Sequence, residues 1–151
     1  MAQSLSRLWT HLIFSTKNRV PFFADKAIRA DVHAYLAEML RKYDCETRIV
    51  GGVEDHVHAL FALSRKHPIA TVIKEVKRTS SGWIKQTSRE FVRFYWQGGY
   101  AAFSVSQSNL NEVIKYIENQ EEHHKRMTFQ DEYRAFLKAH AVDYDERYVW
   151  D

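Results

Sequence analysis

Residues 45–63 read CETRIVGGVEDHVHALFAL and contain two runs of strand-forming residues. The first run, residues 45–53, ends soon after a Gly51-Gly52 pair, and the second covers residues 56–63. Only Glu54-Asp55 separates the two runs, as in a tight turn between neighbouring strands. The stretch therefore predicts an antiparallel β-hairpin.

A strand and a helix are expected before this hairpin. Residues 8–15 are rich in strand-forming side chains and are followed by a polar stretch, which predicts a strand and its exit loop. Asp25 is a suitable N-cap for the helix that follows. Apolar residues then repeat at intervals of three and four, which indicates one buried helical face. They are Ile28, Val32, Tyr35, Leu36, Met39, Leu40 and Tyr43.

A helix and a strand are also expected after the hairpin. Pro68 suits the first turn of a helix that keeps its apolar spacing to about Gln86, and residues 100–105 have the composition of a strand. The first six elements thus run β-α-β-β-α-β, the order of the ferredoxin-like split βαβ fold. The predicted class is α+β: a four-stranded antiparallel sheet with helices on one face, and a further helix, which carries Tyr116, after the last strand.

That further helix begins with an N-x-x-E capping box, formed by Asn109 and Glu112, and is expected to reach about His124. Residues 129–140 show a shorter helical pattern. No conformation is predicted for the acidic and aromatic residues 141–151.

The composition fits a single domain that covers residues 1–151. The chain is 45% hydrophobic, has only five Gly and two Pro, and contains no Gly/Ser-rich linker or repeat that would divide it. Cys45 is the only cysteine, which excludes an internal disulfide and a zinc finger and fits a reducing cytoplasm. The sequence shows neither a signal-peptide layout nor a membrane-spanning run, so we expect a cytoplasmic protein.

The charge of the chain is unevenly distributed. The net charge is +3 although residues 141–151 are acidic, so the basic excess lies in the preceding part. Such an excess favours a polyanionic partner, but it equally describes a solvated surface. Charge alone therefore does not decide between a nucleic-acid-binding protein and other classes.

His56 and His58 lie two residues apart in the second run of the hairpin. Side chains alternate between the faces of a strand, so both imidazoles project from one side while Val57 faces the other. The pair can hold one divalent cation, or it can be two histidines satisfied by water or the backbone. The spacing alone leaves both interpretations open.

Tyr116 and Gln120 are four residues apart in the helix after the last strand, and are therefore neighbours on its surface. They border the apolar stripe of that helix, where a tyrosine with its hydroxyl in water is commonly structural. A phenol is a poor nucleophile at neutral pH and needs a cation to polarise its target. The Gln120 amide oxygen can complete the shell of a cation held by His56 and His58.

The expected metal follows from this set of ligands. Two imidazole nitrogens and one amide oxygen suit Mn²⁺, and Mg²⁺ can act with waters and phosphate oxygens filling its octahedron. Zinc is less expected, because the motif offers neither a cysteine nor a carboxylate ligand. His123 and His124 follow on the same helix, and we interpret them as a solvated helix end outside the metal shell.

Together these residues resemble the single-tyrosine HUH transposases of small bacterial insertion sequences, the IS200-like family. Its motifs are His-hydrophobic-His and a helical Tyr followed four residues later by Gln, which here are His56-Val57-His58 and residues 116–120. The resemblance covers roughly residues 8–126. Within that range it includes residues 11–19, 54–55 and 96–100.

The resemblance implies that Tyr116 attacks a phosphodiester of single-stranded DNA, which yields a 5′-phosphotyrosine and a free 3′-hydroxyl. Rejoining reverses this step at another junction. It also implies a divalent metal, Mg²⁺ or Mn²⁺, held by His56, His58 and Gln120. The phosphotyrosine keeps the bond energy, so no nucleotide cofactor is expected.

The same resemblance implies partners. The DNA would be single-stranded element ends that contain hairpins, and the protein would associate with the nucleoid when bound to DNA. Family members work as dimers, and some place the tyrosine helix of one subunit against the histidine pair of the other. A hinge at Gly98-Gly99 would permit such an exchange here.

Six basic residues are expected to follow the DNA backbone while aromatic side chains stack on unpaired bases. They are Lys17, Arg19, Lys74, Lys77, Arg78 and Lys85. Each residue taken singly is equally well explained as part of a solubilising surface. Two other functions stay open: a domesticated nickase that processes repeated palindromes, and a ferredoxin-like nucleic-acid-binding module without catalysis.

Overall fold

The computed structural model describes residues 2–151, so only Met1 of the expected domain lies outside it. A four-stranded sheet with the order β2-β3-β1-β4 forms its centre, and every neighbouring pair is antiparallel. The strands are β1 (Trp9–Ser15), β2 (Glu46–Gly52), β3 (His56–Ala62) and β4 (Ala101–Ser104). The predicted hairpin and the α+β class are confirmed.

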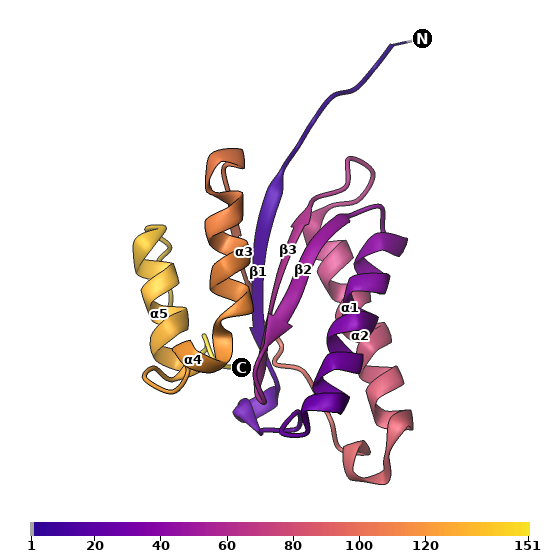
Figure 1. The fold of residues 1–151 in the computed structure, drawn as a ribbon, viewed down its shortest axis with the longest axis vertical. Helices are drawn as coiled ribbons and strands as arrows, with labels where there is room; N and C mark the ends of the chain where they lie inside the picture. The colour runs from indigo at the N-terminus through magenta and orange to yellow at the C-terminus, as the bar shows by residue number, and fades with distance from the viewer. Residues whose placement is uncertain (1) are drawn as a thin grey trace.

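Helices cover both faces of the sheet, as Figure 1 shows. On one face lie α1 (Lys26–Lys42) and α2 (Ile69–Thr87), which are the helices of the split βαβ pattern. On the other lie α3 (Leu110–Glu118), α4 (Gln120–His123) and α5 (Phe129–Ala139). The helix that carries Tyr116 therefore begins a second helical layer. No helix within residues 2–151 is long and apolar enough to cross a membrane.

The residues of β3 divide between these two layers by strand alternation. Val57, Ala59 and Phe61 join the large apolar core beneath α1 and α2. His56 and His58 project to the opposite face, which α3, α4 and α5 cover. The predicted common side of the two histidines is confirmed.

The helix ends follow local sequence in α1 but not in α3. The predicted N-cap Asp25 accepts hydrogen bonds from the backbone N–H groups of Ala27 and Ile28, at 2.8 and 3.2 Å. Asn109, in contrast, makes no capping side-chain bond, so the predicted capping box is wrong. A 3₁₀ turn at Gln107–Asn109 leads into α3 instead.

The helix expected to reach His124 is interrupted at Asn119. This residue has φ −95° and ψ 18°, and Gln120 begins the separate short helix α4. Asn is a poor residue for a helix interior because its short polar side chain competes for backbone hydrogen bonds. The break changes the direction of the chain between Tyr116 and the two histidines that follow.

Gly51 and Gly52, at the end of β2, allow two close backbone approaches. A Cβ on Gly51 would lie 2.7 Å from Ile117 Cγ2 and 3.1 Å from the Ile117 carbonyl oxygen, so α3 packs directly on β2 there. Gly52 has φ 142°, and its Cβ would lie 2.2 Å from the carbonyl oxygen of His56. The pair thus sets both the height of α3 above the sheet and the turn before His56.

Gly52→Ala is expected to lower the free energy of unfolding by about 2 kcal/mol or more, because the backbone angle and the His56 carbonyl both oppose a methyl group. Gly82 in α2 is the matched control, since its Cβ would meet nothing within 4 Å. Gly82→Ala should stabilise the protein by about 0.5–1 kcal/mol through helix propensity. Urea denaturation followed by circular dichroism measures both, and an unchanged Gly52→Ala protein would contradict the close approach.

Candidate active site

The two histidines of the His-x-His motif lie in the middle of the sheet, under the second helical layer. His56 faces Ser15 of β1, and His58 lies between Ile13 of β1 and Gly51 of β2. Both side chains are 0% exposed. Their ring centroids are 5.2 Å apart, so the two imidazoles converge as the spacing predicts.

A carboxylate from α5 meets both imidazoles. Glu132 is 1% exposed, and its Oε1 lies 2.9 Å from His58 Nε2 and 3.3 Å from His56 Nε2. The sequence motifs did not predict this residue. The signal that could have found it is its position one turn after Phe129 and one turn before Phe136, inside the apolar stripe of α5, where a carboxylate needs a partner.

His124 also belongs to this cluster. Its Nε2 lies 3.2 Å from Glu132 Oε1, but the geometry is not that of a hydrogen bond, and this buried nitrogen has no hydrogen-bond partner within residues 2–151. The side chain is only 9% exposed. The expectation that His124 belongs to a solvated helix end is therefore wrong, because the break at Asn119 turns this residue toward the sheet.

Each imidazole is oriented by a contact at its Nδ1 atom. His56 Nδ1 lies 2.7 Å from Asp55 Oδ1, and His124 Nδ1 lies 2.7 Å from the Met127 carbonyl oxygen. His58 Nδ1 lies 2.8 Å from His11 Nε2. In the neutral rings of His56 and His124, Nδ1 must donate to these oxygens, which leaves the Nε2 lone pair free to bind a cation.

The donors fit a divalent metal ion. Ligand atoms of His56, His58, His124 and Glu132 all lie within 4.8 Å of one another, and the unpaired Nε2 of His124 points to a missing partner in this cluster. Gln120 is 1% exposed, and its Oε1 lies 3.1 Å from His56 Nε2. The ligand set does not disfavour zinc, since Glu132 supplies the carboxylate that the motif lacked.

Tyr116 lies at the edge of the same cluster and in the same chain. Its hydroxyl donates to Glu132 Oε2 and lies 3.1 Å from His123 Nε2. The ring contacts His58, with 5.8 Å between centroids, and one side borders an open hollow that Glu112, Glu118 and Lys115 help to line. The tyrosine helix and the histidine pair thus meet without any exchange between subunits.

The buried charges shift the protonation of the cluster. Burial lowers the pKa of His58 to about 4, because the Glu132 contact offsets only part of the desolvation. Burial also disfavours the charged form of His56, but hydrogen bonds to Asp55 and Glu132 outweigh it and raise the pKa to about 9. For Glu132, burial is outweighed by the close contacts with His124, His56 and His58, which hold its pKa well below the usual range.

The pKa of Tyr116 moves in the opposite direction to that of Glu132. Burial, followed by the charge of Glu132 and its hydrogen bond, raises the pKa of the Tyr116 hydroxyl above its usual value. Near neutral pH the hydroxyl therefore keeps its proton and Glu132 is ionised. A reaction of the Tyr116 oxygen would have to remove that proton as the new bond forms.

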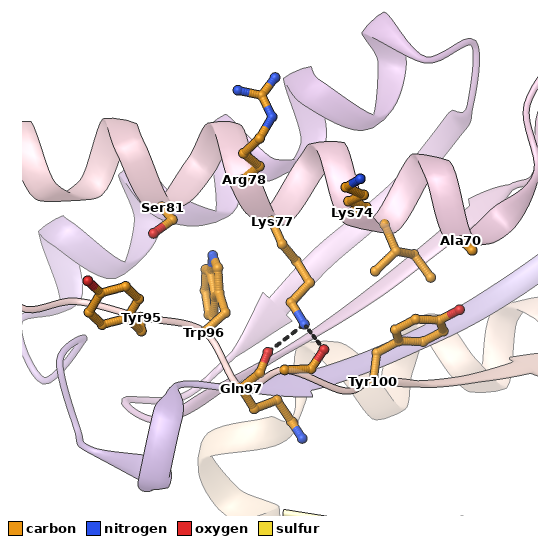
Figure 2. Close-up of a pocket in the computed structure, with 11 residues that line it drawn as sticks. Ala70, Lys74, Lys77, Arg78, Ser81, Tyr95, Trp96, Gln97 and Tyr100 are labelled. Carbon is orange, nitrogen blue, oxygen red and sulfur yellow. Dashed lines mark hydrogen bonds between the residues drawn. The ribbon is translucent and has the colours of Figure 1, made fainter. Parts of the chain in front are cut away.

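The six basic residues expected to contact DNA lie apart from the cluster. Lys74, Lys77, Arg78 and Lys85 lie on α2, on the other face of the sheet. Three of them, Lys74, Lys77 and Arg78, line one hollow, which Figure 2 shows. Lys77 is not free, since its Nζ donates to the carbonyl oxygens of Gln97 at 2.6 Å and Gly99 at 2.9 Å.

The first loop holds the other two basic residues. Lys17 is exposed, whereas Arg19 donates to the carbonyl oxygen of Trp150 at 3.1 Å and lies over the Trp150 ring. Trp150 also packs against Tyr133 of α5. The acidic, aromatic end of the chain therefore folds back on the second helical layer.

The fold and the family follow from comparison with known proteins. A candidate transposase from Deinococcus radiodurans, solved at 1.90 Å resolution, has a TM-score of 0.58 and 24% identity, covering 80% of this chain and 95% of that one. A REP-associated tyrosine transposase bound to a REP hairpin has a TM-score of 0.59 and 12% identity, covering 82% of this chain and 74% of that one. Both likenesses show the fold.

Comparison with curated proteins finds no significant match. The family model described as "Transposase IS200 like" matches residues 4–120, which include His56, His58, Tyr116 and Gln120 and end before His124 and Glu132. Since this match covers most of the chain, the protein belongs to the IS200-like transposase family.

Proposed function

We propose that this chain cleaves and rejoins single-stranded DNA, with Tyr116 as nucleophile and a divalent metal held by His56 and His58. The observation that carries the proposal is the contact chain within one subunit. The Tyr116 hydroxyl touches one oxygen of Glu132, and the other oxygen of Glu132 touches both imidazoles. A nucleophile and a cation site are thereby separated by a single carboxylate.

The cleavage step forms a bond from the Tyr116 oxygen to phosphorus and breaks the bond from phosphorus to the 3′ oxygen. The products are a 5′-phosphotyrosine and a free 3′-hydroxyl. The tyrosine proton passes to one of the two groups in contact with the hydroxyl, Glu132 Oε2 or His123 Nε2. The leaving oxygen takes a proton from water, and rejoining runs the same exchange backwards with another 3′-hydroxyl.

The metal would be Mg²⁺ or Mn²⁺, with His56, His58 and the Gln120 oxygen as the proposed ligands and with Glu132 and His124 beside them. When bound, it would withdraw charge from the phosphate oxygens and so make the phosphorus more reactive. Cation binding would also compensate the Glu132 charge, which now relies on histidine contacts. His11 and Asp55 would still orient the imidazole rings of His58 and His56.

Access to the two imidazoles requires the Glu132 side chain to move. Both imidazoles and Glu132 are buried, whereas Tyr116 borders an open hollow. A DNA strand can therefore approach the nucleophile from solvent. Its phosphate reaches the imidazoles only when the Glu132 side chain moves away from them. Since Tyr116, Glu132 and both imidazoles come from one chain, a homodimer, which we still expect, need not exchange its tyrosine helices.

Hairpin-containing DNA is the partner that we propose. The support is family membership together with the solved neighbour of similar fold that is bound to a REP hairpin. A domesticated nickase acting on repeated palindromes would use the same chemistry, and the genomic surroundings of the coding sequence, with or without element ends, separate these two functions. A non-catalytic binding module would form no covalent adduct.

Tyr116→Phe is expected to abolish covalent adducts completely, because only the hydroxyl oxygen can form the phosphotyrosine. The measurement uses hairpin-bearing single strands from both sides of the coding sequence, with Mn²⁺ and denaturing gels. A 3′-labelled strand should become attached to protein, and a 5′-labelled strand should appear only as a shorter free fragment. Tyr133→Phe, a buried tyrosine of α5, is the control. Adducts that persist in Tyr116→Phe would refute the assignment of the nucleophile.

Mn²⁺ binding should depend on the cluster even without DNA. Isothermal titration is expected to give one site for the wild type, no measurable binding for His58→Ala, and binding weakened by about tenfold or more for Glu132→Gln. His67→Ala, a histidine outside the cluster, is the control. Unchanged affinity in His58→Ala would remove the metal site and would favour the non-catalytic module.

A further inference from the structure

A hollow on the opposite side of the sheet from the histidines contains none of the residues of the proposed cleavage chemistry. It has a volume of about 340 Å³ and lies between α2 and the segment of residues 95–100 that leads to β4. Figure 2 shows Tyr95 and Trp96 toward one end, Tyr100 toward the other, and Lys77 reaching between them. The volume is enough to hold one nucleotide.

The charge of this hollow is of one sign. Lys74, Lys77 and Arg78 line it, and no carboxylate does. Arg78 pairs with Glu75, whereas Lys74 is exposed and makes no ion pair with any residue from 2 to 151. The hollow beside Tyr116, in contrast, is lined by two glutamates and one lysine. The α2 hollow is therefore the better attractor for a phosphate.

Two of the three aromatic side chains that line the hollow are exposed, whereas Trp96 is buried. Tyr95 is 56% exposed and Tyr100 is 37% exposed. Lys85 Nζ lies 3.9 Å from the centroid of the Tyr95 ring, which adds a further cation at this end. A flat apolar ring that is open to solvent beside cations is the arrangement on which proteins stack unpaired bases.

The floor of the hollow is held in place by Lys77. Its Nζ donates to the carbonyl oxygens of Gln97, Gly98 and Gly99, which fastens this segment to α2. Burial lowers the pKa of Lys77 to about 8, in keeping with a structural role. Gln97 exchanges two further hydrogen bonds with the backbone of Ser15, at 2.7 and 2.9 Å. Ser15 pairs with His56, so the hollow is fixed relative to the cluster.

We propose that this hollow binds one unpaired nucleotide of the DNA strand, with the base stacked on Tyr95 or Tyr100 and the phosphate beside Lys74. The choice of DNA rests on the proposed function, but binding here needs neither Tyr116 nor a metal. Bases of a duplex are not accessible for such stacking, and the acidic side chains of a peptide, Asp and Glu, have no flat ring to place there. A strand held here and passing the sheet would meet Tyr116 at a fixed number of nucleotides from this anchor.

The experiment measures fluorescence anisotropy of a labelled ten-nucleotide thymidine strand with EDTA present and with the Tyr116→Phe protein. Tyr95→Ala or Tyr100→Ala should weaken binding about fivefold or more. Tyr148→Ala is the matched control, since Tyr148 is an exposed tyrosine with its own cation partner, Arg147. Lys74→Gln should lower the slope of log affinity against log salt by about 0.7, and Lys138→Gln on α5 should not.

A second arm asks whether the base itself is recognised. A strand with abasic sites should bind the wild type more weakly than the thymidine strand, and the two strands should bind the Tyr95→Ala, Tyr100→Ala double variant equally. Photo-crosslinking of a 5-iodouridine strand should attach to residues 95–100. The proposal would be overturned if both strands bound the wild type equally or if crosslinks formed only outside residues 95–100. Displacement of the strand by polyglutamate as effective as by unlabelled strand would also overturn it.

The outcomes separate this proposal from the proposed function. Normal strand binding at residues 95–100 with no covalent adduct from the wild-type protein would refute the cleavage chemistry alone. Normal adducts with binding unaffected by Tyr95→Ala and Tyr100→Ala would refute the nucleotide site alone.

Discussion

The Glu132 carboxylate joins all three helices of the second helical layer to the sheet through polar contacts. It comes from α5 and contacts His56 and His58 on β3, Tyr116 on α3, and Gln120 on α4. A buried carboxylate is costly unless it is paired and hydrogen-bonded. Here several donors compensate the charge together, and the loss of any one removes part of that compensation. The polar contacts that help to hold this layer on the sheet, beside its apolar packing, therefore also assemble the candidate active site.

Two backbone features bring Tyr116 and its neighbours to this carboxylate. Gly51 lets α3 pack directly on β2, because a side chain there would collide with Ile117. The break at Asn119 then redirects the chain so that Gln120 and His124 both turn inward. A continuous helix would carry its residues along a straight axis, away from the sheet. The geometry of the site thus depends on a glycine and a helix break as much as on its polar side chains.

The two faces of the sheet carry different groups of side chains. The face under α3, α4 and α5 holds the titratable cluster and is largely closed, while the face under α1 and α2 has the apolar core and the basic hollow at its margin. Gln97 and Ser15 join the two through the backbone of β1. DNA binding and DNA cleavage can then be tested separately, because substitutions in the hollow leave the cluster untouched.

Local patterns in the sequence were enough for the fold and for part of the site. Strand alternation put His56 and His58 on one face, helical spacing made Tyr116 and Gln120 neighbours, and the element order indicated the sheet. These are properties of residues a few positions apart, and backbone geometry alone determines them. The family resemblance then joined the two pairs, which no local rule could do.

Tertiary structure alone decided the rest. Glu132 is 74 residues from His58 along the chain, and nothing near it in sequence says which face of the sheet α5 covers. The orientation of His124 depended on a break that Asn119 allows but does not require. In sequence, Arg19 and Lys77 look like the other basic residues. In the structure, Arg19 donates to the carbonyl oxygen of Trp150, and Lys77 donates to that of Gln97. Sequence patterns determined which side chains share a face, while packing determined which faces meet, because burial and pairing of charge are satisfied only between elements that are distant along the chain.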